Sequence, residues 1–329
     1  MNRILESCLL GLGKFLYVLR LYRLVMWWNR RCPKVLLYHA CEHHESEYTA
    51  GLGVNTPPEL FAMHLAFLAR HYEVVPLELL ESGSAPHRAV VITFDDGYRS
   101  VFDQAFPLLR RHAMPAVVYL VTSVVGNEAF VWVNELNWLL RAVPEEARRT
   151  AYAAAQLPPT ATSRLLIDRC RANYDAATVG ALTDQLAATI VSSRRPQARD
   201  ALLYLDWSQI EEMQEAGLRF GNHTHTHPSL PRIDDAGIRQ ELAEASSIIT
   251  ERLGSCRSFA FPFGDVDART RAVAAEPNWA SMMEVGGSNR RLNLRRVARV
   301  TVSARNEAEL FAQLEIVPIL GRIKRLIRR

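Results

Sequence analysis

Short apolar runs without alternating polar residues recur along this chain of 329 residues. Such runs are typical of strands that are covered on both faces, as in parallel α/β sheets and barrels. Three of them occupy residues 35–38, 89–94 and 116–121, and segments with helical periodicity separate them. Further strands are expected at 218–222 and 258–261, and an alternating stretch at 297–302 closes the pattern. A mostly helical stretch rich in Ala and Arg, about 134–200, interrupts the alternation, which resumes at residue 207. The pattern predicts an α/β fold with a helical insertion.

Chemically reactive side chains follow three of the predicted strands, at the point where each strand ends. The first cluster contains Asp95 and Asp96, the second is the His-Thr-His-Thr-His-Pro segment 223–228, and the third is the turn that begins at Pro262. In α/β barrels the carboxyl-terminal ends of the strands converge on the face that holds the active site. We therefore expect the three clusters to form one site.

The histidine cluster favours a metal site. His223 and His227 are four residues apart, and Pro228 disfavours helical geometry at His227. A turn that folds both imidazoles toward one point is the expected arrangement, with His225 pointing away. Two imidazoles and one carboxylate form a three-ligand site with open positions for water, which is typical of a catalytic zinc or a similar divalent ion.

The adjacent carboxylates of Asp95 and Asp96 indicate two different roles. Neighbouring side chains at a strand end leave in different directions, so one can bind the metal while the other acts as a general base. Adjacent carboxylates repel each other, and a nearby cation is needed to keep both ionised. Gly97 permits a tight turn here. An Asp-Asp-Gly sequence on its own more often marks an ordinary turn.

These segments resemble the motifs of the polysaccharide deacetylase family, also called the NodB homology domain or carbohydrate esterase family 4. The Thr-Phe-Asp-Asp-Gly sequence at 93–97 resembles the first motif, and 223–228 fits the second. The Phe-Ala-Phe-Pro-Phe-Gly sequence at 259–264 resembles the third. The resemblance implies a distorted, incomplete (β/α) barrel of the NodB type.

The same resemblance implies a role for each residue of the site. Asp95 would be the catalytic base, and the metal would be held by Asp96, His223 and His227. Zinc is the first expectation for this divalent metal, with cobalt, nickel and manganese as alternatives.

The chain departs from the family pattern at two positions. Many members carry an arginine in the third motif that orients the base, and Ala260 occupies the matching position here. Many also carry a late histidine that acts as a general acid, and no histidine follows His227. His39, at the end of the first predicted strand, is the best substitute acid, and a supporting or packing role fits it equally well.

The implied activity is metal-dependent hydrolysis of N-acetyl groups, on a polysaccharide that contains N-acetylhexosamine or on a lipid-linked saccharide. Asp95 would take a proton from the attacking water, and a backbone N–H in the turn formed by Pro262, Phe263 and Gly264 would hold the oxyanion. Two alternatives remain open: a glycan O-acetyl esterase on the same site, and a non-catalytic glycan-binding module that retains the metal.

Both ends of the chain are basic and amphipathic. Residues 1–34 carry a net charge of +6 and residues 318–329 carry +5, which leaves −7 for the part between them. Apolar residues spaced between basic ones predict an amphipathic N-terminal helix, and Trp27 and Trp28 suit a membrane headgroup zone. We expect a basic N-terminal segment (1–33), a deacetylase-like barrel (34–317) and a basic tail (318–329).

This charge pattern favours peripheral contact with an anionic membrane surface, while ordinary surface helices are the alternative. Nucleic acid is not expected as a partner, because no recognition motif accompanies the basic residues. No apolar run reaches the roughly 18 residues that span a membrane, and Glu6 interrupts any signal-peptide core. Five scattered cysteines indicate reduced thiols. We expect a cytoplasmic protein at the inner face of the membrane; export with an uncleaved N-terminal anchor is the alternative.

Overall fold

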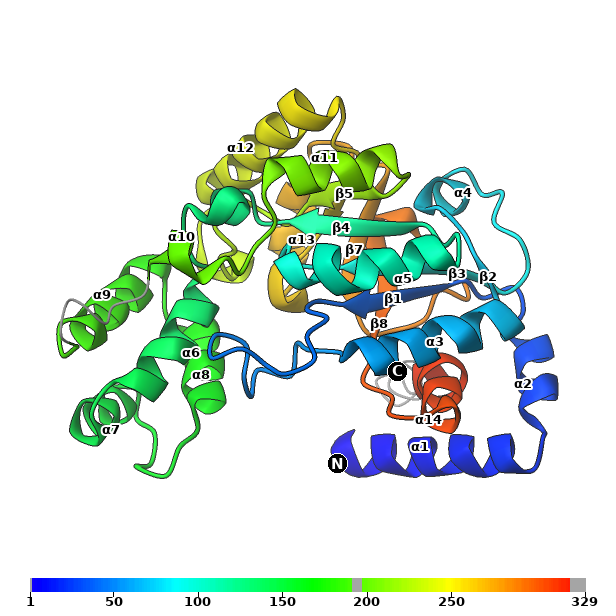
Figure 1. Cartoon of the computed structure of the whole chain (residues 1–329), viewed down its shortest axis with the longest axis horizontal. Helices are drawn as coiled ribbons and strands as arrows, with labels where there is room; N and C mark the ends of the chain where they lie inside the picture. Colours follow the sequence, from blue (N-terminus) through cyan, green and yellow to red (C-terminus); the bar gives the residue numbers. More distant parts are fainter. Residues whose placement is uncertain (1, 191–196, 320–329) are drawn as a thin grey trace.

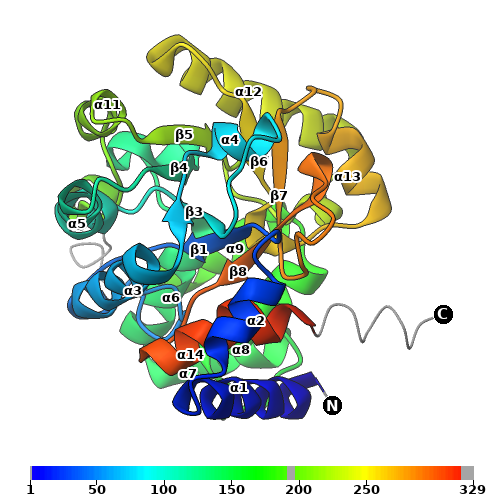
Figure 2. The same cartoon turned by 90° about the vertical axis from the view of Figure 1, so that its right-hand side faces the viewer.

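The structure is a computed structural model that describes residues 2–190 and 197–319, and a ring of parallel strands forms its centre (Figure 1). In ring order the strands are β1 (Lys34–Tyr38), β3 (Ala89–Phe94), β4 (Ala116–Leu120), β5 (Arg219–Asn222), β6 (Ser258–Ala260), β7 (Ser281–Val285) and β8 (Val297–Thr301). Because β1 pairs with both β3 and β8, the ring is closed (Figure 2). The predicted (β/α) barrel is confirmed, with seven strands where the common (β/α) barrel has eight.

The strands are buried on both faces, as their continuous apolar sequences predict. Every residue of β1, β3 and β4 is buried. A layer of helices covers the outside of the ring: α3 (Pro58–His71), α4 (Leu77–Glu81), α5 (Phe106–Arg111), α11 (Trp207–Glu215), α12 (Asp235–Leu253) and α13 (Ala268–Ala274). Asp206 begins α11 with a capping box, and Asp234 caps α12. One turn of π-helix, Val101–Ala105, precedes α5.

Two strands were not predicted from the apolar pattern. β7 contains two methionines and a glutamate instead of a run of β-branched residues. β2 (Glu73–Val74) is only two residues long and pairs with the beginning of β3. Pairing with neighbouring strands sets their places in the sheet, and this pairing cannot be read from the local sequence.

Five of the described α-helices between β4 and β5 precede α11 and lie at the carboxyl-terminal end of the barrel (Figure 1). They are α6 (Trp132–Ala142), α7 (Glu145–Ala154), α8 (Ser163–Asn173), α9 (Ala176–Ala187) and α10 (Ala198–Ala201). Most of them share an apolar core of their own, in which Leu136, Tyr152, Leu166 and Leu186 are buried. This helical insertion forms one wall of the pocket described below.

The N-terminal helix α1 (Asn2–Val18) packs on α14 (Glu307–Phe311) and on the π-helix Ala312–Ile316, near the end of the described chain. Helix α2 (Tyr22–Trp28) contacts the same region through the Tyr22 and Phe311 rings. A Cβ atom on Gly13 would lie 2.4 Å from the Cβ of Ala312, so only glycine allows this close packing. None of the described helices combines the length and the apolar character that a membrane span requires. Most of the predicted basic tail, residues 320–329, lies outside the described part of the chain.

Candidate active site

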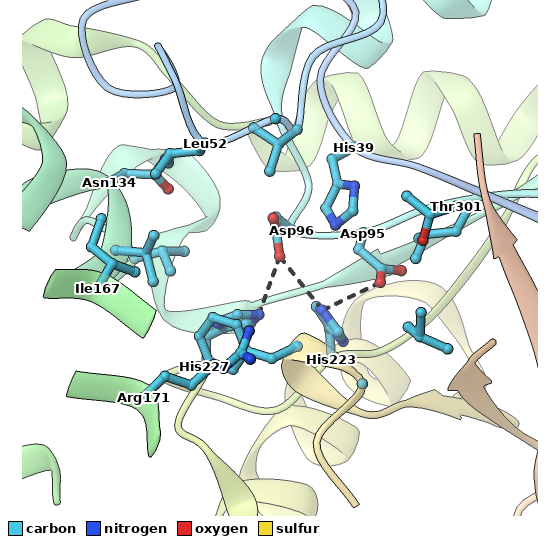
Figure 3. A pocket seen from close by; sticks show the side chains of 18 of the residues that line it. His39, Leu52, Asp95, Asp96, Asn134, Ile167, Arg171, His223, His227 and Thr301 are labelled. Atoms are coloured by element: carbon cyan, nitrogen blue, oxygen red, sulfur yellow. Dashed lines mark ion pairs between the residues drawn. The ribbon is translucent and has the colours of Figure 1, made fainter. Parts of the chain in front are cut away.

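A pocket of about 220 Å³ opens at the carboxyl-terminal end of the barrel. Residues that follow β1, β3, β5 and β6 line it, together with side chains of α8 (Figure 3). Its titratable residues near the strand ends are His39, Asp95, Asp96, His223 and His227. The clusters predicted from separate strand ends therefore meet in one place.

Asp96, His223 and His227 converge on a single point. The Oδ1 atom of Asp96 lies 3.5 Å from Nε2 of His223 and 3.3 Å from Nε2 of His227 (Figure 3). One ligand atom from each residue lies within 4.8 Å of the others, and all three residues are buried. This is the set that the sequence resemblance implies for the metal.

The donor atoms of this set fit a divalent cation. Nδ1 of His223 donates a hydrogen bond to the carbonyl oxygen of Ala260 at 2.8 Å, so the neutral ring turns an unprotonated Nε2 toward Asp96. Among the described residues, the buried Oδ1 of Asp96 has no hydrogen-bond partner. A lone pair facing a carboxylate is repulsive unless a proton or a metal ion lies between them. Two imidazoles and a carboxylate are ligands that zinc and similar ions accept.

The electrostatics of the site keep its carboxylates ionised. Burial would raise the pKa of Asp96, but His223 and His227 hold that pKa well below its usual range. Burial would likewise lower the pKa of His223, and the carboxylates of Asp95 and Asp96 raise it instead. Negative charge is thus concentrated beside the two imidazoles, where a cation would bind.

Left-handed backbone conformations direct these side chains. Asp96 has a φ of 70°, and the following Gly97 has a φ of 73°. The turn sends the carboxylates of Asp95 and Asp96 to different sides, as Figure 3 shows. Thr224 (φ 70°) and His227 (φ 61°) bend the second loop in the same way. Such conformations are costly for residues other than glycine, and they cluster at functional sites.

A carboxylate on α12 holds the loop between His223 and His227. Glu241 accepts hydrogen bonds from the backbone N–H groups of His225 and Thr226 at 2.8 Å each, and from Oγ1 of Thr226 at 2.6 Å. The His225 ring points away, as predicted, and contacts Thr122 at 2.9 Å and Glu244 at 3.2 Å. Glu241 therefore fixes the loop without touching the pocket.

Asp95 is paired with an arginine that the sequence analysis did not assign to the site. Arg299, in the middle of β8, donates to both carboxylate oxygens of Asp95, at 2.6 and 2.7 Å, and it is fully buried. Burial would raise the pKa of Asp95, but Arg299 and His223 together lower it. An arginine from β8 thus contacts the predicted base, although Ala260 occupies the third-motif position. The only sequence signal for this contact was the presence of an arginine inside a predicted strand.

His39 lies across the two aspartates from His223 (Figure 3). It lines the pocket and is half-buried. Burial lowers the pKa of His39, and the carboxylates of Asp96 and Asp95 oppose that shift. The His39 ring therefore lies where it could exchange a proton with a group bound in the pocket beside Asp95 and Asp96.

The turn after β6 closes the pocket beside His227. Phe263 packs edge-on against the His227 ring with 4.4 Å between the centroids, and it lines the pocket with Gly264. Pro262 is buried and has no N–H, and the N–H of Gly264 donates to the carbonyl of Phe261 at 3.1 Å. The N–H of Phe263 is the remaining donor of this three-residue turn.

Comparisons with known proteins agree with this geometry. The family model described as "Polysaccharide deacetylase" matches residues 82–279. A poly-beta-1,6-N-acetyl-D-glucosamine N-deacetylase of Staphylococcus epidermidis is 39% identical over 57 residues, 17% of this chain and 20% of that protein. The match thus spans about a fifth of the length of this curated relative.

Two solved structures share the fold. The Streptococcus pyogenes deacetylase PplD in complex with acetate has a TM-score of 0.58 and 17% sequence identity, and the match covers 86% of this chain and 98% of that one. IcaB from Ammonifex degensii has a TM-score of 0.56 and 18% identity, with 86% of this chain and 97% of that one covered. At this level of identity the likeness establishes the architecture alone.

Proposed function

This chain belongs to the polysaccharide deacetylase family, and we propose that it hydrolyses N-acetyl groups on a glycan that contains N-acetylhexosamine. The observation that carries the proposal is the buried Asp95–Arg299 pair beside the set formed by Asp96, His223 and His227. In this arrangement Asp95 would act as an ionised base beside a cation site in the same pocket. The S. epidermidis relative is an N-deacetylase, which supports amide cleavage in this proposal.

In this proposal Asp96, His223 and His227 hold a divalent metal, with zinc as the first expectation. Such an ion supplies a Lewis acid for the amide carbonyl and lowers the pKa of a nearby water. Arg299 keeps the carboxylate of Asp95 ionised and holds its orientation with two hydrogen bonds. Asp95 can then accept the proton of the water that attacks the acetyl carbon.

Two further groups would complete the reaction. The N–H of Phe263 is the backbone donor that we propose for the developing oxyanion. His39 would deliver a proton to the departing amine, since it lies across the aspartates from His223. Cleavage of the carbon–nitrogen bond then yields acetate and a free amine on the sugar. Asp95 has gained one proton from the water and His39 has given one to the amine, so transfer of a proton from Asp95 to His39 would restore both groups, and one water is consumed overall.

The sugar chain would lie along the wall formed by the helical insertion. Arg164, Ile167, Asp168 and Arg171 of α8 line the pocket. Charged planar groups can hydrogen-bond sugar hydroxyls, while Ile167 offers an apolar contact. A polysaccharide or a lipid-linked saccharide would satisfy this wall equally.

Acetate release from N-acetylated oligosaccharides and lipid-linked sugars tests the proposal. The full chain would be assayed with zinc, with cobalt, and after chelation, alongside the variant Asp95→Asn. The matched control is Asp103→Asn, since Asp103 is exposed and, among the described residues, forms its one ion pair with Arg99, one turn earlier. Metal-dependent release that is lost in Asp95→Asn and kept in Asp103→Asn supports an N-deacetylase.

Two results would redirect the proposal. Release from O-acetylated substrates alone would favour the esterase alternative. Stoichiometric metal and glycan binding without release from any substrate would favour a binding module. Arg299 weighs against the binding module. It is an arginine beside Asp95, in a chain whose third motif lacks the arginine that many family members have there.

A further inference from the structure

Exposed large apolar side chains are concentrated on the two N-terminal helices. Eight of them lie between residues 12 and 28: Leu12, Phe15, Val18, Leu19, Leu21, Leu24, Trp27 and Trp28. Elsewhere in the described residues, Leu165, Leu202 and Val285 are the other large apolar side chains with comparable exposure, and they are far apart in sequence. Single exposed apolar residues are ordinary, whereas a contiguous group of this size marks an interaction surface.

This exposed face, defined by the eight residues above, is not the face that packs on the body of the protein. The inner face of α1 contacts the C-terminal helices through Gly13, and Tyr17 donates to Glu307 at 2.7 Å. Leu12 and Phe15 are three residues apart, so they share one side of α1, and Leu19 follows in the turn just after the helix. Among them Phe15 is 60% exposed. Helix α1 therefore presents apolar side chains to solvent while it is already held in place.

Basic side chains border the same face. Arg23, on α2, lines a hollow of about 280 Å³ with Arg70, His71 and Arg88, and no acidic side chain lines it. Within the described part of the chain, Arg20, Arg23 and Arg88 form no ion pair with a carboxylate, whereas Arg70 pairs with Glu307. The combination of an apolar face, flanking arginines and two exposed tryptophans matches the boundary between lipid headgroups and acyl chains.

We infer that this face of α1 and α2 docks on the surface of an anionic phospholipid bilayer. The apolar side chains would enter the boundary layer, and Arg20, Arg23 and Arg88 would contact lipid phosphates. Unpaired positive charge favours an anionic lipid surface over a second copy of the chain, which would bring like charges together. The inference does not depend on the proposed deacetylase activity.

Docking also leaves the pocket accessible. In Figure 1, α1 runs along the lower edge of the molecule, roughly parallel to β1, and α2 lies at the end of the barrel opposite the helical insertion. With α1 on a bilayer, the pocket opens sideways along the membrane surface. A glycan held near the membrane could enter from that side.

Vesicle co-sedimentation of the full chain tests the inference. The probes are phosphatidylcholine vesicles with and without 30% phosphatidylglycerol, at low and high salt. We expect binding to the anionic vesicles that weakens at high salt, and at least tenfold weaker binding for Phe15→Ser/Trp28→Ser and for Arg20→Gln/Arg23→Gln. Matched controls are Leu165→Ser/Leu202→Ser and Arg110→Gln/Arg111→Gln, which change other exposed residues outside the face. Thermal unfolding checks that each variant is folded.

Three results would overturn the inference. One is the absence of wild-type binding to either kind of vesicle. Another is binding that the variants in the face and the control variants change equally. The third is a dimer, detected by light scattering, that Phe15→Ser/Trp28→Ser dissociates while vesicles remain unbound, since the face would then serve a second copy of the chain.

Discussion

Replacement of Arg299 by methionine is expected to reduce both stability and activity, because it leaves the Asp95 carboxylate buried without its partner. The pair is joined by two hydrogen bonds of 2.6 and 2.7 Å, and Asp95 is only 3% exposed. Two unit charges about 4 Å apart attract by about 4 kcal/mol at an effective dielectric constant of about 20. Removal of one partner from a buried pair costs about 3–5 kcal/mol, which agrees.

Urea unfolding at pH 7 measures this loss, and a double-mutant cycle assigns it to the pair. The cycle comprises Arg299→Met, Asp95→Asn and the double variant. We expect the double variant to lose less stability than the sum of the single losses, with a coupling energy of about 2 kcal/mol or more. Arg291→Met is the control, since Arg291 is exposed and its loss should change stability by no more than about 0.5 kcal/mol.

The activity of the same variants separates orientation of the base from simple packing. Arg299→Lys retains the positive charge but cannot form two parallel hydrogen bonds. We expect it to recover part of the stability while kcat stays at least tenfold reduced. Additive stability losses in the cycle, or near wild-type kcat in Arg299→Met, would refute the role that we assign to Arg299.

Further predictions concern the base, the metal loop, the cofactor and a buried histidine. Asp95→Asn should lower kcat by about 10²–10⁴ without changing metal content, as measured by acetate release and elemental analysis. Glu241→Ala should weaken metal affinity by about 10–100-fold in a competition with a chelator, because the loop loses three hydrogen bonds; unchanged affinity would contradict this. Chelation should abolish acetate release, and added zinc should restore it. Burial lowers the pKa of His64, so the unfolded state binds its proton first as pH falls. Stability should therefore decline as the pH falls below about 7, by up to about 1.4 kcal/mol per pH unit. The contribution of His64 to this pH dependence of stability should vanish in His64→Gln. The same pH dependence in the wild type and the variant would contradict the prediction.

The barrel could be predicted from the sequence because its strands are buried on both faces. The runs at β1, β3 and β4 are therefore continuously apolar and stand out from the helical segments between them. The convergence of Asp95, Asp96 and the histidines followed from their positions at strand ends, since parallel strands place those ends together.

Arg299 and Glu241 could not be assigned in the same way. Arg299 and Asp95 are 204 residues apart in the sequence, and the local sequence of β8 does not indicate that they are in contact. Glu241 lies on the polar face of α12, where a glutamate ordinarily contacts solvent. Both contacts depend on the closure of the barrel, which is a property of the whole chain.

The separate apolar core of the helical insertion gives the molecule two parts that can change independently. Substitutions on α8 would alter the wall that we propose meets the sugar, and the insertion would accommodate them within its own core around Leu166 and Leu186. The strands that hold Asp95 and the histidines need not move. Under the proposed function, exchange of this one contiguous segment would adapt the chain to a new glycan while the residues that remove the acetyl group stay the same.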